Sequence, residues 1–197
     1  MIPPRLVLAT ANPGKVRELR ALVTEWGPID ALSLADFPSV RLPEEVGATY
    51  AENARAKATV VAQATGLPAL ADDSGLEVDA LGGAPGVRSA RYGPSDATRI
   101  EKLLAALGAR GADDRRARFR CAVAVVWPDG RVETGEGECA GTIAMAASGE
   151  GHGFGYDPIF IADELGRTFA AACAHEKGSV SHRARAMRAL GSRLGVT

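Results

Sequence analysis

Short apolar runs alternate with helix-favouring segments over the first third of the chain. The runs at 5–10 (RLVLAT), 29–33 and 69–72 (ALAD) have the length of buried strands. The segments between them, 15–26 and 49–64, place apolar or alanine residues at helical spacing, and the second has no interior Gly or Pro. Such alternation predicts an α/β fold, because each connecting helix lets consecutive strands pair in parallel.

A hairpin pattern in the second half makes the predicted sheet mixed. Residues 117–128 (ARFRCAVAVVWP) are the most strand-like segment, and Asp129-Gly130 is typical of a tight turn into a second strand over 131–141. The remaining predicted elements are a surface loop over 81–94, a helix over 96–108 with Ser95 as N-cap, a strand around 158–161 and a helix that begins after Ser181. We therefore predict an α/β fold in one domain over residues 1–197, with a twisted mixed sheet flanked by helices.

The charge and the apolar runs exclude several classes of protein. A net charge of −1 lacks the basic excess of a dedicated nucleic-acid-binding protein. No run approaches the roughly 18 apolar residues of a membrane-spanning helix, and the N-terminus lacks the layout of a signal peptide. The three Cys, at 121, 139 and 173, have no metal-ligand spacing. We expect a cytoplasmic protein with no nucleic-acid partner and no membrane partner.

The segment 10–15 joins a predicted strand to a predicted helix and is the first candidate for chemistry. Its residues are Thr10, Ala11, Asn12, Pro13, Gly14 and Lys15. Backbone N–H groups at a helix start suit a phosphate, and an anion there would also offset the unfavourable placement of Lys15 in the first helical turn. The segment is not a Walker loop, because the first Gly is missing and Val16 stands where Ser or Thr binds magnesium. An ordinary turn with a solvated Lys is the alternative.

Four carboxylates form the second candidate. Glu44 and Glu45 lie in a predicted loop over 35–47, and Asp72 and Asp73 end the predicted strand over 69–72, where α/β folds usually place their sites. Carboxylates that converge on one point repel each other unless a hard cation or a proton lies between them, so the set indicates a magnesium site. The alternative is that the sequence Asp-Asp-Ser-Gly after residue 71 forms an Asx turn.

Two further segments could hold the base of a nucleotide. The Gly-rich segment 153–158 (GFGYDP) contains two aromatic residues, so a ring flanked by glycines could stack on a base while Asp157 binds its edge. Lys177, His182 and Arg183 could supply donors or bind phosphate near the start of the last helix. The alternatives are an aromatic that plugs the core and a solvated basic turn. Together the four candidates hold the parts needed for a nucleoside triphosphate.

Five blocks in order carry a resemblance to a known family. They are LATANPGKVREL, EEVGATYAENARAKA, ADDSGLEVDALGGAPGVRSARY, GFGYDPIF and EKGSVSHRARAM. Over roughly residues 6 to 190, the chain resembles the inosine triphosphate pyrophosphatases, and in particular the bacterial branch of that family. The only two asparagines of the chain, Asn12 and Asn53, lie inside these blocks.

The resemblance implies an elongated α/β fold with two lobes, an active site in the central cleft and a homodimer. It also implies hydrolysis of purine nucleoside triphosphates such as ITP, dITP and XTP between the α and β phosphorus atoms. The products are the monophosphate and pyrophosphate, the cofactor is Mg²⁺, and the role is removal of deaminated purines from the nucleotide pool.

The resemblance also implies a role for each matched residue. Asp73 acts as general base, and the metal site draws on Asp72, Asp73 and one of Glu44 and Glu45. The phosphates are held by Thr10, Ala11, Asn12, Pro13, Gly14, Lys15 and Lys57, with Ser74 beside the base. The purine is stacked and oriented by Phe154, Gly155, Tyr156 and Asp157, and its edge is read by Lys177, His182 and Arg183.

Two departures and two alternatives accompany this interpretation. Family members often have Gly where this chain has Ala11, and Asn where it has Gly178, but neither change removes a charged group. A related Maf-type nucleotide pyrophosphatase would prefer uridine or modified pyrimidine nucleotides. A nucleotide-sensing or RNA-binding protein would bind without turnover, although four carboxylates near the phosphate site would repel an RNA backbone.

Overall fold

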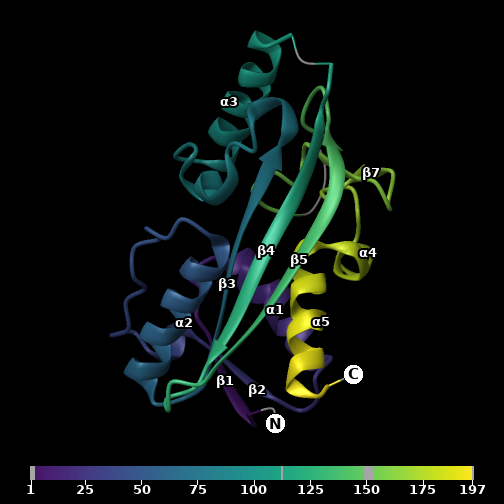
Figure 1. The fold of residues 1–197 in the computed structure, drawn as a ribbon. Coiled ribbons are helices and arrows are strands. Elements are labelled where there is room, and N and C mark those ends of the chain that lie inside the picture. Colours follow the sequence, from purple (N-terminus) through teal and green to yellow (C-terminus); the bar gives the residue numbers. More distant parts are fainter. Residues whose placement is uncertain (1–2, 112, 149–152, 197) are drawn as a thin grey trace. The chain divides into compact units, whose positions relative to one another are not determined.

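A seven-stranded sheet with helices around it is formed by the residues that the computed structural model describes, which are 3–111, 113–148 and 153–196 (Figure 1). The strand order is β2-β1-β3-β4-β5-β6-β7. The strands are β1 (Arg5–Leu8), β2 (Asp30–Ser33), β3 (Ala69–Val78), β4 (Arg116–Val126), β5 (Val132–Ile143), β6 (Phe160–Ala162) and β7 (Arg167–Thr168). The helices are α1 (Pro13–Thr24), α2 (Tyr50–Thr65), α3 (Asp96–Ala109), α4 (Ala174–Val180) and α5 (His182–Leu194), with 3-10 turns at Leu34–Asp36, Asp79–Leu81 and Gly86–Arg91.

The strand pairing confirms the predicted mixed α/β sheet. Strand β1 pairs in parallel with β2 and with β3, whereas β6 pairs antiparallel with β5 and β7. The predicted hairpin is also confirmed, since β4 and β5 are neighbours joined by a turn in which the Gly130 N–H donates to the Trp127 carbonyl at 2.9 Å. Gly130 adopts a φ of 89°, which favours glycine at this position.

The chain divides into two compact units. The first contains Met1–Asp73, Cys121–Gly137 and Arg183–Thr197, and the second contains Ser74–Arg120 and Glu138–His182. The prediction of a single domain over residues 1–197 stays a prediction. None of the helices in the described part of the chain is long and apolar enough to cross a bilayer.

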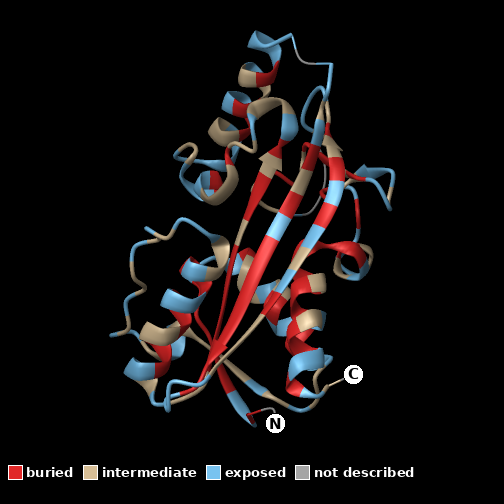
Figure 2. Ribbon diagram, in the orientation of Figure 1, coloured by how far each residue is buried: buried red, intermediate tan, exposed pale blue. Residues whose placement is uncertain are grey.

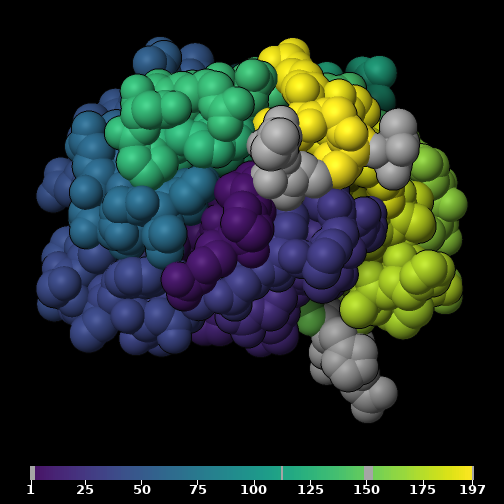
Figure 3. All heavy atoms as spheres, turned by 90° about the horizontal axis from the view of Figure 1, so that it is seen from below, coloured from purple at the N-terminus to yellow at the C-terminus, as the bar shows by residue number. Residues whose placement is uncertain are grey.

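The first unit has two apolar layers, because side chains on a strand alternate between the faces of the sheet. On one face, Leu6 and Leu8 of β1 pack with apolar side chains of α1 and α5. On the other face, Val7 and Ala9 pack against the alanine-rich side of α2. Figure 2 shows the buried residues along the strands and on the inward sides of these helices. In the view from below, the N-terminal segment, the β4–β5 turn and the C-terminal helix share one surface of this unit (Figure 3).

The second unit has an aromatic core. The ring of Phe119 on β4 meets that of Phe160 on β6 edge-on, with centroids 4.7 Å apart, and lies parallel to that of Phe169 at 5.9 Å. Apolar side chains of α3 and the end of β3 complete this core. The core supports the loop that carries Tyr156, whose side chain is buried in it.

The predicted strand over 69–72 is too short, and this changes the position of the two aspartates. Strand β3 continues to Val78, so Asp72 and Asp73 lie in its middle instead of at its end. The alternative of an Asx turn at Asp72 is therefore wrong. Both carboxyls are buried against basic or amide partners, and these contacts let two acidic residues occupy a central strand.

Candidate functional site

The turn between β1 and α1 is organised by Asn12. Its side-chain oxygen accepts hydrogen bonds from the N–H groups of Gly14 at 2.8 Å and Lys15 at 3.1 Å, so Asn12 is the N-cap of α1 and Pro13 is its first residue. The Thr10 hydroxyl oxygen accepts from the Asn12 N–H at 3.2 Å. The predicted strand–turn–helix junction is confirmed, but its first two helical N–H groups are engaged by the cap. A phosphate at this turn would therefore meet the Asn12 amide group and the Lys15 ammonium before those backbone groups.

Asp72 lies at the centre of a buried ionic cluster in the first unit. Its carboxylate, which is inaccessible to solvent, accepts from Arg183 Nε at 3.0 Å and Nη2 at 2.8 Å, and lies 3.0 Å from Lys15 Nζ. Arg183 also binds Glu18 of α1. Burial alone would raise the pKa of the Asp72 carboxyl, but the charges of Lys15 and Arg183 outweigh it and hold this pKa well below its usual range. Two carboxylates and two cations thus meet between α1, β3 and α5.

Asp73 points to the other face of β3 and meets α2. Asn53 Nδ2 donates to its Oδ2 at 2.9 Å, and Lys57 Nζ lies 3.7 Å from its Oδ1. Asn53 and Lys57 are four residues apart, so both project from the same side of the helix. Lys57 also donates to Glu45 Oε1 at 2.6 Å, and the two carboxylates therefore share one ammonium group.

The carboxyl of Asp73 has the opposite pKa shift from that of Asp72. Burial raises the pKa of Asp73, the charge of Lys57 opposes this shift, and the nearby charge of Glu45 reinforces it. Burial would lower the pKa of the Lys57 ammonium, but the charges of Asp72 and Asp73 raise it. Asp73 is thus a carboxylate whose affinity for a proton is increased, and Lys57 remains a cation beside it.

The four predicted metal ligands are not brought together. Asp72 faces Arg183 and Lys15, Asp73 faces α2, and of the two glutamates Glu45 is the one whose carboxylate reaches Lys57, whereas Glu44 is exposed. Within the described residues, no three His, Cys, Asp or Glu side chains gather closely enough to hold a metal by themselves. Two carboxylates that share the Lys57 ammonium group are close enough to suit a divalent ion. Such an ion would take its remaining ligands from substrate phosphates and water, as Mg²⁺ commonly does. Asp73 and Glu45 fit such an ion, whereas Asp72 contacts Lys15 and Arg183, so its predicted role as a ligand stays a prediction.

In the second unit, Asp157 organises the predicted base-binding loop. Its Oδ2 accepts from the Phe154 N–H at 2.9 Å and from Lys177 Nζ at 2.6 Å. Lys177 Nζ also lies 4.9 Å from the centroid of the Phe154 ring, which is half-buried. These contacts bring three predicted residues together, and Asp157 supports the ring and the ammonium group.

The other predicted residues of this region have structural contacts. Tyr156 is the core-plugging aromatic that the alternative interpretation described, and its hydroxyl donates to the Ser89 carbonyl at 3.0 Å. The Gly155 N–H donates to Asp96 Oδ2 at 2.7 Å. His182 is buried, and its ring stacks on Phe119 with centroids 4.6 Å apart. The prediction that His182 and Arg183 read the purine edge stays a prediction.

Three residues contact the predicted site residues but were not assigned a role from the sequence. Glu18 binds Arg183, Asp96 holds the loop at Gly155, and Asn53 holds Asp73. Asn53 carried a usable signal, because the chain has only two asparagines. Glu18 and Asp96 carried none, since acidic residues are common in this chain. The neighbour Ser74 is half-buried on β3.

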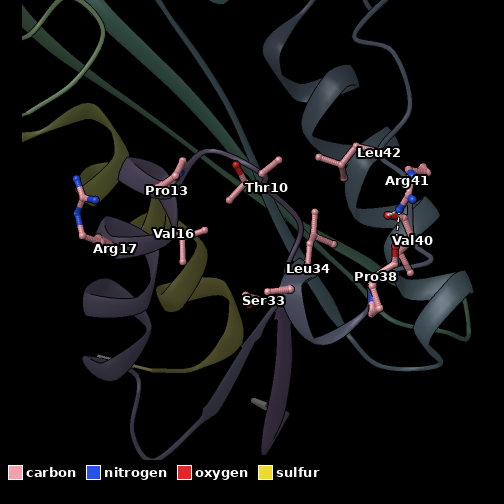
Figure 4. Close-up of a pocket in the computed structure, with 12 residues that line it drawn as sticks. Thr10, Pro13, Val16, Arg17, Ser33, Leu34, Pro38, Val40, Arg41 and Leu42 are labelled. Atoms are coloured by element: carbon pink, nitrogen blue, oxygen red, sulfur yellow. Dashed lines mark hydrogen bonds between the residues drawn. The ribbon is translucent and has the colours of Figure 1, made fainter.

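A cavity of about 710 Å³ lies in the first unit beside the turn between β1 and α1 (Figure 4). It is lined by Thr10, Ala11, Pro13, Val16, Arg17, Ser33, Leu34, Ala35, Pro38, Val40, Arg41 and Leu42. Most of this lining is apolar, and Arg41 Nη1 is engaged by the Pro38 carbonyl across its rim. Thr10, Ala11 and Pro13 of the turn belong to this lining, whereas Asp73 and Glu45 do not.

Comparison with known proteins identifies relatives over nearly the whole chain. The model of the Ham1 family matches residues 6–193. The dITP/XTP pyrophosphatase of Thermus thermophilus is 53% identical over 188 residues, covering 94% of this chain and 89% of that protein. The dITP/XTP pyrophosphatase of Gloeobacter violaceus is 52% identical over 185 residues, covering 94% and 91%. A solved HAM1 protein from Coxiella burnetii has a TM-score of 0.86 at 40% identity, covering 98% of this chain and 99% of that one.

These matches agree with the mixed α/β sheet and confirm the resemblance that the five sequence blocks carry. Because the family model spans almost all of its residues and the relatives match over more than nine-tenths of it, the chain belongs to the Ham1 family.

Proposed function

We propose that this protein hydrolyses deaminated purine nucleoside triphosphates, namely dITP, XTP and ITP, to the monophosphate and pyrophosphate. Relatives about half identical to it are named dITP/XTP pyrophosphatases, which bears out the prediction of a nucleoside triphosphate pyrophosphatase. The observation that carries the proposal is the contact of the buried Asp73 and the half-buried Glu45 with the buried Lys57, in which two carboxylates share one ammonium group. A family of this kind requires a divalent metal in general, and we propose Mg²⁺ held by Asp73 and Glu45.

The raised pKa of Asp73 supports its role as general base. A carboxylate with an increased affinity for protons is better suited to accept one from an attacking water at neutral pH. The bound cation would supply positive charge next to the phosphates, where charge builds up during phosphoryl transfer. In this arrangement Asn53 orients Asp73 through one carboxylate oxygen, and the other oxygen faces Lys57.

Lys15 and Lys57 are the cations that we propose for the triphosphate. Lys57 is buried against the two carboxylates, and the Lys15 ammonium lies beside the turn capped by Asn12. Positive groups fixed in place before the reaction stabilise the negative charge that develops on a leaving pyrophosphate. The polar groups of Thr10 and Asn12 would hold the same phosphates, and Ala11, Pro13 and Gly14 shape the turn, with Ser74 beside the base.

For the purine, we propose that Phe154 stacks on the ring system and that Lys177 contacts its polar edge. Asp157, Gly155 and Tyr156 act by fixing this loop through Lys177, Asp96 and Ser89. Hypoxanthine and xanthine carry a carbonyl oxygen at the six-position where adenine carries an amino group. A donor from His182 or Arg183 to that oxygen would disfavour adenine by roughly 10²–10⁴ or more, because a buried donor would stay unpaired. We also propose a homodimer in the cytoplasm.

The test is a substrate panel with purified protein and Mg²⁺. ITP, XTP, dITP, GTP, ATP and a modified pyrimidine triphosphate are supplied separately, and pyrophosphate and orthophosphate are measured. We expect pyrophosphate from ITP, XTP and dITP, with much slower turnover of ATP. Orthophosphate release, equal rates on ATP and ITP, or a preference for the pyrimidine would reject the proposal, and binding without turnover would favour a nucleotide sensor.

A further inference from the structure

The buried side chain of Asn53 uses both ends of its amide group. Its Nδ2 donates to Asp73 Oδ2 at 2.9 Å, and its Oδ1 accepts from the Gly47 N–H at 2.8 Å. The residue is 2% exposed, so both hydrogen bonds form away from bulk water. One side chain therefore bridges a central strand and the loop that precedes α2.

The loop end of this bridge lies two residues after Glu45. Glu45 accepts from Lys57, which is one helical turn after Asn53 on α2. Asn53 and Lys57 thus each contact both parts of the candidate metal site, because each reaches Asp73 on β3 and the Glu45 loop. The relative position of the two carboxylates is fixed by two adjacent side chains of one helix.

The close approach of the loop depends on Gly47. A Cβ atom at this position would lie 2.6 Å from Asn53 Oδ1 and 2.9 Å from Glu52 Cβ, closer than real Cβ atoms approach. Any other residue would push the loop away from α2 and lengthen the bond to Asn53. The hydrogen bond from the Gly47 N–H to Asn53 Oδ1 therefore requires glycine at position 47.

A purely structural role at the start of α2 does not account for this bridge. The helix already has its own N-terminal cap, because the Thr49 hydroxyl accepts from the Glu52 N–H at 3.2 Å and Glu52 Oε2 accepts from the Ala48 N–H at 2.8 Å. Asn53 lies one turn further on and directs its amide to Asp73 and Gly47 instead of the helix end.

We propose that Asn53 is a positioning residue that holds Asp73 and the Glu45 loop at the separation that a divalent cation needs. This inference rests on the proposed function. An amide is suited to the task because it has a donor for a carboxylate and an acceptor for a backbone N–H, whereas aspartate lacks the donor and leucine lacks both. Such supporting partners orient metal ligands that would otherwise have to be ordered when the ion binds.

The first test compares Asn53→Leu with Gln63→Leu. Gln63 is exposed on the same helix, so its substitution is the same kind of change away from the bridge. Mn²⁺ is titrated into each protein without nucleotide and its binding is followed by electron paramagnetic resonance. We expect Asn53→Leu to weaken Mn²⁺ binding and to lower kcat by roughly 10–100-fold each, and Gln63→Leu to match the wild type. The KM for dITP should change by less than about threefold.

A second test reaches the same bridge from the loop and remains available if Asn53→Leu does not fold. Gly47→Ala keeps the amide but displaces its partner, and Gly108→Ala on α3 is its control, because a Cβ there meets nothing within 4 Å. We expect weaker Mn²⁺ binding for Gly47→Ala by about tenfold. Circular dichroism melts identify any variant that is unfolded at the assay temperature.

Two outcomes overturn the inference. One is a folded Asn53→Leu, or a folded Gly47→Ala, with Mn²⁺ affinity and kcat like the wild type; a lower melting temperature of that variant would make the bridge structural only. The other is a raised KM with an unchanged kcat, which would place Asn53 in substrate binding. Failure of the proposed function is separate, because it would appear as a wild-type protein without pyrophosphate release from dITP.

Discussion

Asp72 and Asp73 are neighbours on one strand, and both carboxylates are buried, but their surroundings differ. Asp72 meets the cations Lys15 and Arg183, which outweigh burial and lower its pKa. Asp73 meets an amide and shares Lys57 with Glu45, and burial raises its pKa. A buried carboxylate matched by its own cations is typical of a structural pair, whereas one with an increased affinity for protons is suited to chemistry.

This contrast also separates stability from activity at adjacent positions. Removing a carboxylate that its surroundings stabilise should cost folding free energy, because the buried Arg183 and the half-buried Lys15 lose the partner that they share. Removing a carboxylate that its surroundings destabilise should cost activity and leave stability intact or increased. Substitutions at the two positions therefore test whether Asp72 contributes mainly to stability and Asp73 mainly to activity.

The largest expected effect is loss of turnover in Asp73→Asn. The amide keeps the shape of the side chain but cannot accept a proton from water, so kcat for dITP should fall by about 10²–10⁴-fold or more. The melting temperature should stay equal or rise, since the ionised carboxyl with a raised pKa is disfavoured in the folded state. Pyrophosphate release and calorimetry measure the two quantities. The control is Asp163→Asn at an exposed position, and a fully active Asp73→Asn protein would remove Asp73 from the role of base.

Asp72→Asn should have its main effect on stability. It leaves Arg183 and Lys15 without the carboxylate that both contact, so the free energy of unfolding should fall by about 3–5 kcal/mol. Urea unfolding measures this change. In Asp30→Asn, which removes the exposed pair with Arg5, the loss should stay below about 1 kcal/mol. Equal losses in the two variants would show that burial of the Asp72 cluster contributes little.

Lys57→Met should lower turnover to a smaller extent than Asp73→Asn. The substitution keeps the apolar stem but leaves Asp73 and Glu45 without their shared ammonium group, so kcat should fall by about 10²–10³-fold. The control is Lys102→Met on α3, whose ammonium contacts Tyr92 in the second unit. Steady-state kinetics on dITP with both variants checks this order, and an unchanged kcat in Lys57→Met would contradict the assignment.

The smallest expected effect concerns thiol reactivity beside Asp72. Burial, reinforced by the charge of Asp72, raises the pKa of the Cys121 thiol to about 12, whereas Cys173 is exposed. Native protein treated with iodoacetamide should therefore be labelled at Cys173 and protected at Cys121. Loosening of the cluster in Asp72→Asn should increase labelling of Cys121, as measured by peptide mass spectrometry. Equal labelling of both thiols in the wild type would show that the region around Asp72 opens readily.

Much of the fold could be predicted because its signals are local. The alternation of strands and helices, the turn at Asp129-Gly130 and the helix start after Asn12 all depend on residues close together in the chain. Helix α4 was missed because Gly178 lies inside it and the segment is short. The full length of β3 was missed because its acidic residues have the composition of a turn, and the partners that keep them in a strand come from elsewhere.

The sequence predicted which residues belong to the site better than it predicted how these residues are arranged. The blocks indicated Asp72 and Asp73 together, but the alternation along β3 and the partner Arg183, which lies 111 residues away, separate their environments. Similarly, the adjacent glutamates looked equivalent until the contact of Glu45 with Lys57 distinguished them. Long-range partners of this kind leave no local pattern.

The four-residue spacing of Asn53 and Lys57 on α2 limits how this segment can change in length. An α-helix turns by about 100° for each residue, so one inserted residue between Asn53 and Lys57 would rotate one side chain relative to the other and prevent both from reaching Asp73. An insertion in the preceding loop before Glu44 would leave their spacing unchanged. We therefore expect insertions to be tolerated in the loop and rejected between Asn53 and Lys57 of α2.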